Sequence, residues 1–127
     1  MTKFPYHKSS GGEYFPIIEF VIYHKNRITR TSALIDSGAT ISVFKDEVAE
    51  QLGIEIEKGE KTYLGGVGGR IKGYIHKLKV EIGGKKFICP IVFSHEYLVS
   101  FNLLGRQEFF RRFKIIFEEK KNFLKLE

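Results

Sequence analysis

The tripeptide Asp36-Ser37-Gly38 follows an apolar run at residues 33–35. Because Asp, Ser and Gly are each common in turns, the tripeptide alone fits an ordinary β-turn. A turn aspartate normally follows polar sequence, however, whereas Asp36 follows apolar residues, so its carboxylate is expected to be partly desolvated. A partly buried carboxylate is costly unless it is paired, protonated or functional. Asp36 is therefore a candidate for acid–base chemistry.

Aspartate is scarce in this chain, which contains thirteen Glu but only two Asp. The second, Asp46, begins the stretch DEVAEQLG, where Phe44, Val48 and Leu52 recur every four residues and predict a short helix. A carboxylate in the first turn of a helix is favoured by the helix dipole, and Gly53 is a typical C-terminal cap. Asp46 is thus explained as a helix-start residue. If Asp36 acts with a second aspartate, that partner must come from another chain.

A glycine-rich loop lies between two predicted strands, residues 61–64 and 70–80. Its five positions are Gly65, Gly66, Val67, Gly68 and Gly69. The loop lacks the G-x-x-x-x-G-K-[ST] pattern of phosphate-binding loops, and the G-x-G-x-x-G pattern fails because position 71 is Ile. A glycine-rich hairpin tip of this kind can fold over an extended ligand. Taken alone, the loop is equally compatible with an ordinary flexible hairpin.

The elements that position these residues are short and mostly extended. Residues 17–23 and 29–35 predict a β-hairpin whose second strand leads into Asp36. Further strands are predicted at residues 86–93, 113–117 and 123–126. Many short strands with glycine turns predict a mostly-β barrel or sandwich.

Two further segments complete this picture. The spacing of Phe109 and Phe113 predicts a second short helix within residues 106–113. Pro, Ser and Gly residues punctuate residues 1–16, which are expected to form an irregular, partly disordered arm before a single domain at 17–127.

Composition narrows the function classes. The 127 residues are 43% hydrophobic, as in a globular protein, and the single cysteine, Cys89, cannot form an internal disulfide. No leader-like or membrane-spanning segment is visible, so a cytoplasmic protein without membrane contact is expected.

The histidines lack metal-ligand spacing, and no metal or cofactor is expected. The net charge of +6 is spread over scattered pairs, which favours a solvated surface over a nucleic-acid-binding one.

In order along the chain, ALIDSGAT, YLGGVGGRIKGY and NLLGRQEFF resemble the catalytic loop, the flap and the final apolar-apolar-Gly segment of the retropepsin-like aspartic proteases. This family contains the retroviral proteases and their cellular relatives, and the resemblance covers residues 17–117. It implies a closed, mostly-β fold with one or two short helices, and a homodimer that hydrolyses an extended polypeptide. Asp36 from each subunit would meet its counterpart across the two-fold axis, share one proton with it and activate a water.

The same resemblance implies roles for the neighbouring residues. Ser37 would lock the two catalytic loops together, and Gly38 would leave room for the substrate backbone. Ala39 and Thr40 would continue the floor of the cleft. The glycine-rich loop, residues 65–69, would close over the substrate, with Val67 capping the site.

Three departures from the family pattern are visible. Viral enzymes often carry an acidic residue at the position of Thr40, which pairs with the arginine matching Arg106. Arg70 takes a flap position that is often apolar and is expected to make the closed cleft more polar. The chain also continues through residues 118–127 as an added strand, which suggests a rebuilt dimer interface. A non-catalytic dimerisation or peptide-binding module with the same fold is the alternative function.

Overall fold

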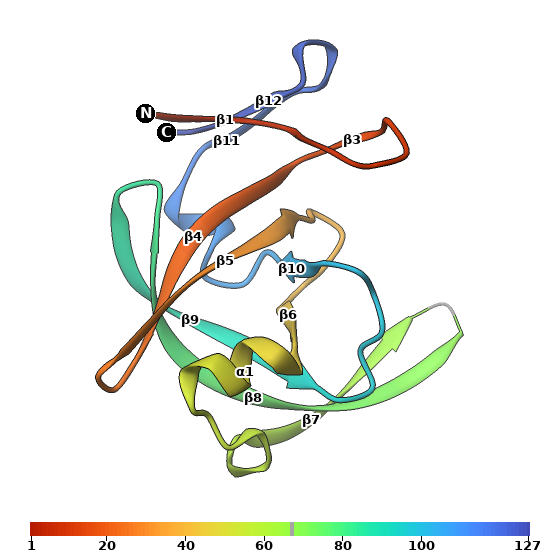
Figure 1. Cartoon of the computed structure of the whole chain (residues 1–127), viewed down its shortest axis with the longest axis vertical. Helices are drawn as coiled ribbons and strands as arrows, with labels where there is room; N and C mark the ends of the chain where they lie inside the picture. Colours follow the sequence, from red (N-terminus) through yellow and green to blue (C-terminus); the bar gives the residue numbers. More distant parts are fainter. Residues whose placement is uncertain (67) are drawn as a thin grey trace.

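β-Strands make up most of the chain (Figure 1). The computed structural model describes residues 1–66 and 68–127. The strands are β1 (Thr2–Pro5), β2 (His7–Lys8), β3 (Tyr14–Phe15), β4 (Ile17–His24), β5 (Arg27–Ile35), β6 (Ser42–Lys45), β7 (Glu60–Gly66), β8 (Gly69–Ile82), β9 (Lys85–Ser94), β10 (Asn102–Leu104), β11 (Ile115–Glu118) and β12 (Phe123–Leu126). The helical elements are α1 (Asp46–Leu52) and the 3-10 turns η1 (Ile56–Lys58), η2 (Phe110–Arg112) and η3 (Glu119–Lys121).

The main sheet closes on itself. Its strand order is β4-β5-β10-β6-β9-β8-β7, and an additional β4–β8 pairing joins the sheet into a ring of hydrogen-bonded strands. Fully buried side chains fill the interior, including Ile22, Phe44, Val80 and Phe93. The predicted mostly-β fold is confirmed, and its closure takes the form of this ring.

The β4–β5 hairpin forms as its sequence predicts. β4 is rich in β-branched and aromatic residues, and its alternate side chains Ile18, Phe20 and Ile22 are buried. The two strands pair antiparallel across a turn in which Lys25 has a φ of 54°. This hairpin fixes the end of β5 and therefore the position of Asp36.

Helix α1 also agrees with its sequence. Val48, Ala49 and Leu52 are its buried residues, and Asp46 lies in its first turn. Gly53 closes the helix with a φ of 68°, and its backbone N–H donates to the carbonyl of Glu50. Asp46 is therefore a helix-start residue, as predicted.

The prediction of a second α-helix is wrong. Residues 106–113 form turns and the short η2, because Glu108 has a φ of 65°, which an α-helix cannot accommodate. The Glu108 carboxylate accepts hydrogen bonds from Arg111 and Arg112. Phe109 and Phe113 are nevertheless both buried. The spacing of these two phenylalanines therefore reflects their packing in the core and not an α-helix.

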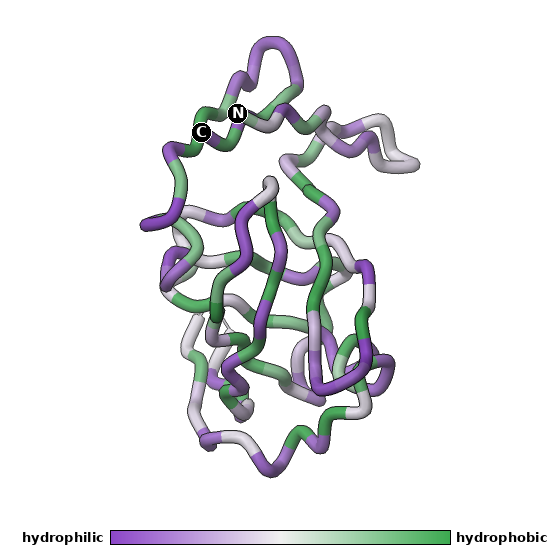
Figure 2. The backbone as a smooth tube through the Cα atoms, turned by 90° about the vertical axis from the view of Figure 1, so that its left-hand side faces the viewer, coloured by the Kyte–Doolittle hydropathy of each residue, from purple (hydrophilic) through white to green (hydrophobic). Residues whose placement is uncertain are grey.

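The prediction of an irregular N-terminal arm is also wrong. β1 pairs antiparallel with β12, which in turn pairs with β11, and β2 pairs with β3. Figures 1 and 2 show the two chain ends side by side on the sheet of β1, β12 and β11, which we call the terminal sheet. The hydrogen-bonding partner of β1 lies at the far end of the sequence, so local composition could not reveal it. The predicted C-terminal strand is present as β12.

Replacing Phe44 by alanine is expected to destabilise the fold by about 3–5 kcal/mol, because the ring is fully buried and leaves a cavity. Phe44 packs edge-on against Phe20 and Phe93, with ring centroids 5.9 and 6.3 Å apart. Urea unfolding monitored by circular dichroism measures the difference. Phe117→Ala is the matched control, because that ring is 40% exposed and should cost about 1 kcal/mol or less. Similar losses in the two variants would contradict this placement of the core.

Candidate active site

Asp36 lies immediately after β5, in a turn held by its own side chain. The backbone N–H of Gly38 donates to Asp36 Oδ1 at 2.9 Å, and the N–H of Ala39 donates to the Asp36 carbonyl at 3.2 Å. Asp36 is half-buried, whereas Ser37 and Gly38 are exposed. The partial burial of Asp36 is in line with its place after an apolar run.

Main-chain hydrogen bonds from residues 104–107 fix the position of this turn. β10 runs parallel to β5, and the carbonyl of Leu104 accepts the N–H of Asp36 at 3.0 Å. Beyond β10, the N–H groups of Arg106 and Gln107 each donate at 2.8 Å to the carbonyls of Ala39 and Thr40. Both ends of the Asp36 turn are therefore fixed by main-chain hydrogen bonds.

Gly105 permits this close packing of two backbones. A Cβ at this position would lie 2.5 Å from the carbonyl oxygen of Ile41 and 2.8 Å from that of Ala39. Real Cβ atoms do not approach backbone oxygens so closely, so any other residue would displace one of the two segments. The N–H of Gly105 also donates to the Ser42 hydroxyl at 3.1 Å.

Arg106 takes part in this support through its main chain. Its N–H is bonded to Ala39, as described above. Among the ion pairs of residues 1–66 and 68–127, none involves the Arg106 side chain. The acidic partner that Thr40 fails to supply is thus not replaced by another carboxylate within the described part of the chain.

A cleft of about 560 Å³ opens over Asp36. Its lining comes from the Asp36 turn and the residues up to β6, from the β7–β8 hairpin, and from the segment after β9 up to β10. The lining residues are Asp36, Gly38, Ala39, Thr40, Ile41, Val43, Tyr63, Leu64, Gly65, Gly66, Gly69, Ile71, Tyr97, Val99 and Leu103. Asp36 is the one carboxylate in this described lining, and its surroundings are largely apolar.

Most of the residues predicted to contact substrate meet at this cleft. Those that line it are Ala39, Thr40, Gly65, Gly66 and Gly69. Gly68 is exposed, with a φ of 95°, and is not part of the lining; Val67 lies outside the described residues. Ser37, which was predicted to lock two catalytic loops together, is also outside the lining.

Arg70 does not line the cleft, contrary to the expectation that it makes the cleft more polar. On β8, the flanking residues Gly69 and Ile71 line the cleft, and Arg70 between them does not. The Arg70 guanidinium carbon lies 4.4 Å from the centroid of the Tyr63 ring, a cation–π contact. The Arg70 side chain therefore contacts another residue of the same hairpin.

Sequence reasoning missed Tyr97, which forms part of the cleft wall. Its hydroxyl donates to the carbonyl of Phe101 at 2.8 Å. Burial, and then the nearby charge of Asp36, raise the pKa of Tyr97 to about 12, so the phenol stays neutral near pH 7. A single tyrosine within an apolar segment carries no spacing signal, so only the fold could bring it to this site.

A larger hollow of about 1030 Å³ lies between the N-terminal residues and strands β4 and β5. Phe4, Phe15 and Phe101 are among its lining, and Asp36 is not. Its lining includes Glu19 and Arg30 but lacks an arrangement of groups with an evident reaction. The cleft over Asp36 is therefore the candidate active site.

The remaining sequence candidates lie elsewhere. Cys89 is fully buried, and burial raises the pKa of its thiol to about 11, as expected for a packed apolar side chain.

In the described part of the chain, no group of three or more His, Cys, Asp or Glu side chains is arranged to hold a metal ion. None of the described helices has the length and apolar character needed to span a membrane.

Comparison with known proteins agrees with this geometry. A family model described as "Aspartyl protease" matches residues 24–107, a range that includes the Asp36 turn, the β7–β8 hairpin and Gly105. A comparison with curated protein sequences found no match.

Two solved structures share the fold. A retropepsin-like aspartic protease from Rickettsia conorii superposes with a TM-score of 0.67 at 22% identity, covering 98% of each chain. EIAV protease in complex with the inhibitor HBY-793 superposes with a TM-score of 0.59 at 23% identity, covering 77% of this chain and 88% of the other. Because the family model matches more than half of the sequence, this chain belongs to the aspartyl protease family, and its fold is retropepsin-like.

Proposed function

We propose that this protein is a homodimeric aspartic endopeptidase that hydrolyses extended polypeptides through paired Asp36 carboxylates. The observation that carries the proposal is the placement of Asp36 as the one carboxylate in the described lining of a largely apolar cleft. Aspartic protease chemistry uses two close carboxylates. One chain supplies a single aspartate to this cleft, so a second copy must supply the other.

The proposed chemistry is acid–base catalysis by the pair. Two carboxylates close together cannot both be ionised at low cost, so they share one proton. The ionised carboxylate removes a proton from a bound water, whose oxygen attacks the carbonyl carbon of the scissile peptide bond. The protonated carboxyl donates to the developing oxyanion, and a proton passes to the leaving nitrogen as the C–N bond breaks.

Several contacts support this role for the Asp36 turn. The hydrogen bond from the Gly38 N–H to Oδ1 orients the carboxylate, and the bonds from residues 104–107 make the turn rigid. Pre-organised groups of this kind lower the cost of reaching the transition state. Ser37 is exposed in the single chain, which is compatible with a place at the two-fold axis.

We assign the β7–β8 hairpin the role of a flap. A Cβ added at Gly65, Gly66, Gly68 or Gly69 would meet no atom within 4 Å, so these four glycines have open space around them. An extended peptide beneath it would bind through strand-like main-chain hydrogen bonds. Val67, outside the described residues, remains the predicted cap of the site.

The dimer interface is expected to differ from one in which the termini of two subunits interleave. β12 is the central strand of the terminal sheet, with β1 on one side and β11 on the other. Its main-chain groups are therefore already paired within one chain. Strands of a second subunit could add only at the edges formed by β1 and β11.

Mixing wild-type and Asp36→Asn subunits tests the pairing directly. If each active site needs Asp36 from two chains, activity should fall with the square of the wild-type fraction. An exchanged one-to-one mixture would then retain about a quarter of the wild-type activity at equal total protein. Peptide hydrolysis is the readout, and sedimentation confirms that the subunits have exchanged.

Retention of about half the activity would mean that each chain acts alone, which would overturn the paired mechanism. Peptide binding without hydrolysis by the wild-type dimer would instead favour a non-catalytic peptide-binding module.

A further inference from the structure

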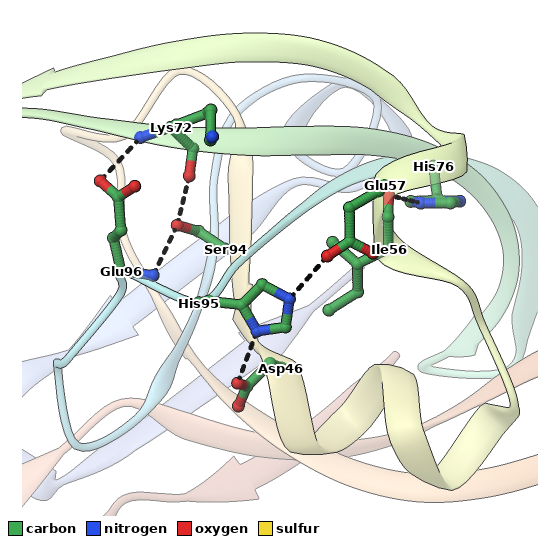
Figure 3. A network of polar contacts seen from close by, with 8 residues as sticks. All are labelled: Asp46, Ile56, Glu57, Lys72, His76, Ser94, His95 and Glu96. Atoms are coloured by element: carbon green, nitrogen blue, oxygen red, sulfur yellow. Dashed lines mark hydrogen bonds and ion pairs between the residues drawn. The ribbon is translucent and has the colours of Figure 1, made fainter.

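His95, the residue after β9, lies between two carboxylates (Figure 3). Its Nδ1 is 3.0 Å from Asp46 Oδ2 on α1, and its Nε2 is 3.0 Å from Glu57 Oε1 on η1. An ionised carboxylate only accepts hydrogen bonds, so both ring nitrogens must donate. The geometry therefore requires the doubly protonated, positively charged imidazole.

The residues on either side of His95 bind the backbone of the β7–β8 hairpin. The Ser94 hydroxyl donates to the Lys72 carbonyl, and the Lys72 N–H donates to Glu96 Oε1 at 3.2 Å. The Glu96 N–H in turn donates to the Ser94 hydroxyl at 3.1 Å. Residues 94–96, which we call the clamp, therefore connect α1, η1 and β8, as Figure 3 shows.

The chain that leaves the clamp forms one wall of the cleft. Tyr97 and Val99 both line the cleft with Asp36, and Leu98 between them is 90% exposed. The bond from the Tyr97 hydroxyl to Phe101 folds this wall segment, residues 97–101, onto itself. The N–H of Tyr97 donates to the Ser94 carbonyl at 3.4 Å, so this end of the wall is joined directly to the clamp. The other end is held by Phe101, whose ring centroid lies 5.9 Å from that of Phe15.

We propose that His95 is a positioning residue for peptide binding: its protonated ring holds the clamp, and through it the cleft wall, in the geometry that accepts substrate. This inference rests on the proposed peptidase function. It adds a pH-dependent element outside the Asp36 pair.

The charges around His95 define the direction of this pH dependence. Asp46 faces the ring from α1 and Glu57 from η1, while Lys72 on β8 lies near Glu57. The carboxylate of Glu96, the next residue in the clamp, is directed to the Lys72 backbone. Hydrogen bonds to Asp46 and Glu57 raise the pKa of His95 above its ordinary value. A raised histidine pKa means that the clamp is complete below the ordinary pKa and is lost as the pH rises through the folded value.

On the acid side, the pKa of Glu57 is lowered, first by a backbone hydrogen bond and then by the hydrogen bond to His95. The carboxylate therefore keeps its charge to a lower pH than a free glutamate. The clamp is expected to hold between the pH at which the first of its two carboxylates, Asp46 or Glu57, takes up a proton and the pH at which His95 loses one.

A titration by NMR tests the coupling without relying on catalysis. Imidazole signals are followed from about pH 5 to pH 9 in the wild type and in Asp46→Asn, with His7→Gln as an assignment control at an exposed histidine. His95 should titrate above the ordinary histidine pKa, and the backbone amides of Tyr97 and Val99 should shift with the same midpoint. Asp46→Asn should lower that midpoint. Amides that do not follow His95 would overturn the proposal.

Steady-state kinetics then test the effect on substrate. Below the pKa of His95, His95→Gln should raise KM about two- to fivefold, the range expected for losing exposed ion pairs, with a smaller change in kcat. His95→Lys, which keeps a positive charge throughout, should restore a low KM with little dependence on pH. Peptide binding to Asp36→Asn, measured across the same pH range, removes the contribution of the catalytic pair.

The outcomes separate the two proposals. Equal KM–pH profiles in wild type and His95→Gln would reject the positioning role even if hydrolysis is confirmed. If no peptide is hydrolysed or bound but the amides of Tyr97 and Val99 follow His95, the peptidase proposal fails while the clamp itself stands.

Discussion

Asp36→Asn is expected to reduce peptide hydrolysis by a factor of roughly 10²–10⁴ or more, the range associated with loss of a general acid or base. Asparagine has nearly the same shape and can still accept the Gly38 N–H through its amide oxygen. It can neither remove a proton from water nor share one with a second carboxylate. The fold and the dimer should therefore survive while the chemistry is lost.

The measurement uses a library of peptides, with thermal unfolding and sedimentation as checks on fold and assembly. Glu13→Gln is the matched carboxylate-to-amide control, because Glu13 is exposed and does not line the cleft. Its activity should stay within about fivefold of wild type. Undiminished hydrolysis by a folded Asp36→Asn dimer would show that another group carries out the reaction.

Gly105→Ala is expected to have the second largest effect. The new Cβ would lie 2.5 Å from the Ile41 carbonyl oxygen, an atom of the backbone that cannot rotate away. Strain of this kind should cost about 1–3 kcal/mol of folding stability. Displacing the Asp36 turn by about 1 Å should also reduce hydrolysis by about a hundredfold.

Gly11→Ala provides the comparison, because its added Cβ would meet only the Ser9 hydroxyl at 3.7 Å, an ordinary contact. It should leave both stability and hydrolysis close to wild type. Urea unfolding and kcat/KM are measured for both variants. Full activity in Gly105→Ala would mean that the backbone of residues 104–107 does not control the geometry of Asp36.

The elements predicted correctly from sequence are those whose stabilising contacts are local. The β4–β5 hairpin follows from β-branched and aromatic runs on either side of a short turn, and α1 follows from the spacing of Val48 and Leu52 with Gly53 as its cap. The errors involve partners distant in sequence. β1 is ordered by β12, and the positive φ of Glu108 interrupts the periodicity that predicted a second helix.

The residues of the candidate site also fall into two groups, those that a local sequence pattern reveals and those that only the fold reveals. Asp36 and the glycines around it carry a recognisable local pattern, and the structure places most of them at one cleft. Tyr97 and His95 carry no such pattern, and they acquire their contacts only through folding. Arg70 shows the converse, because its position in the motif did not reveal that its guanidinium contacts the Tyr63 ring.

The sequence by itself determined that Asp36 follows an apolar run at the end of a strand, that a glycine-rich hairpin comes later in the chain, and that the pattern resembles that of a retropepsin-like protease. These features depend on residue type, periodicity and order along the chain. Only the tertiary structure decided that Gly105 supports the Asp36 turn, that Tyr97 closes one wall and that His95 holds that wall to α1 and η1. Contacts between distant segments arise from how the strands close into a ring, which no local pattern encodes.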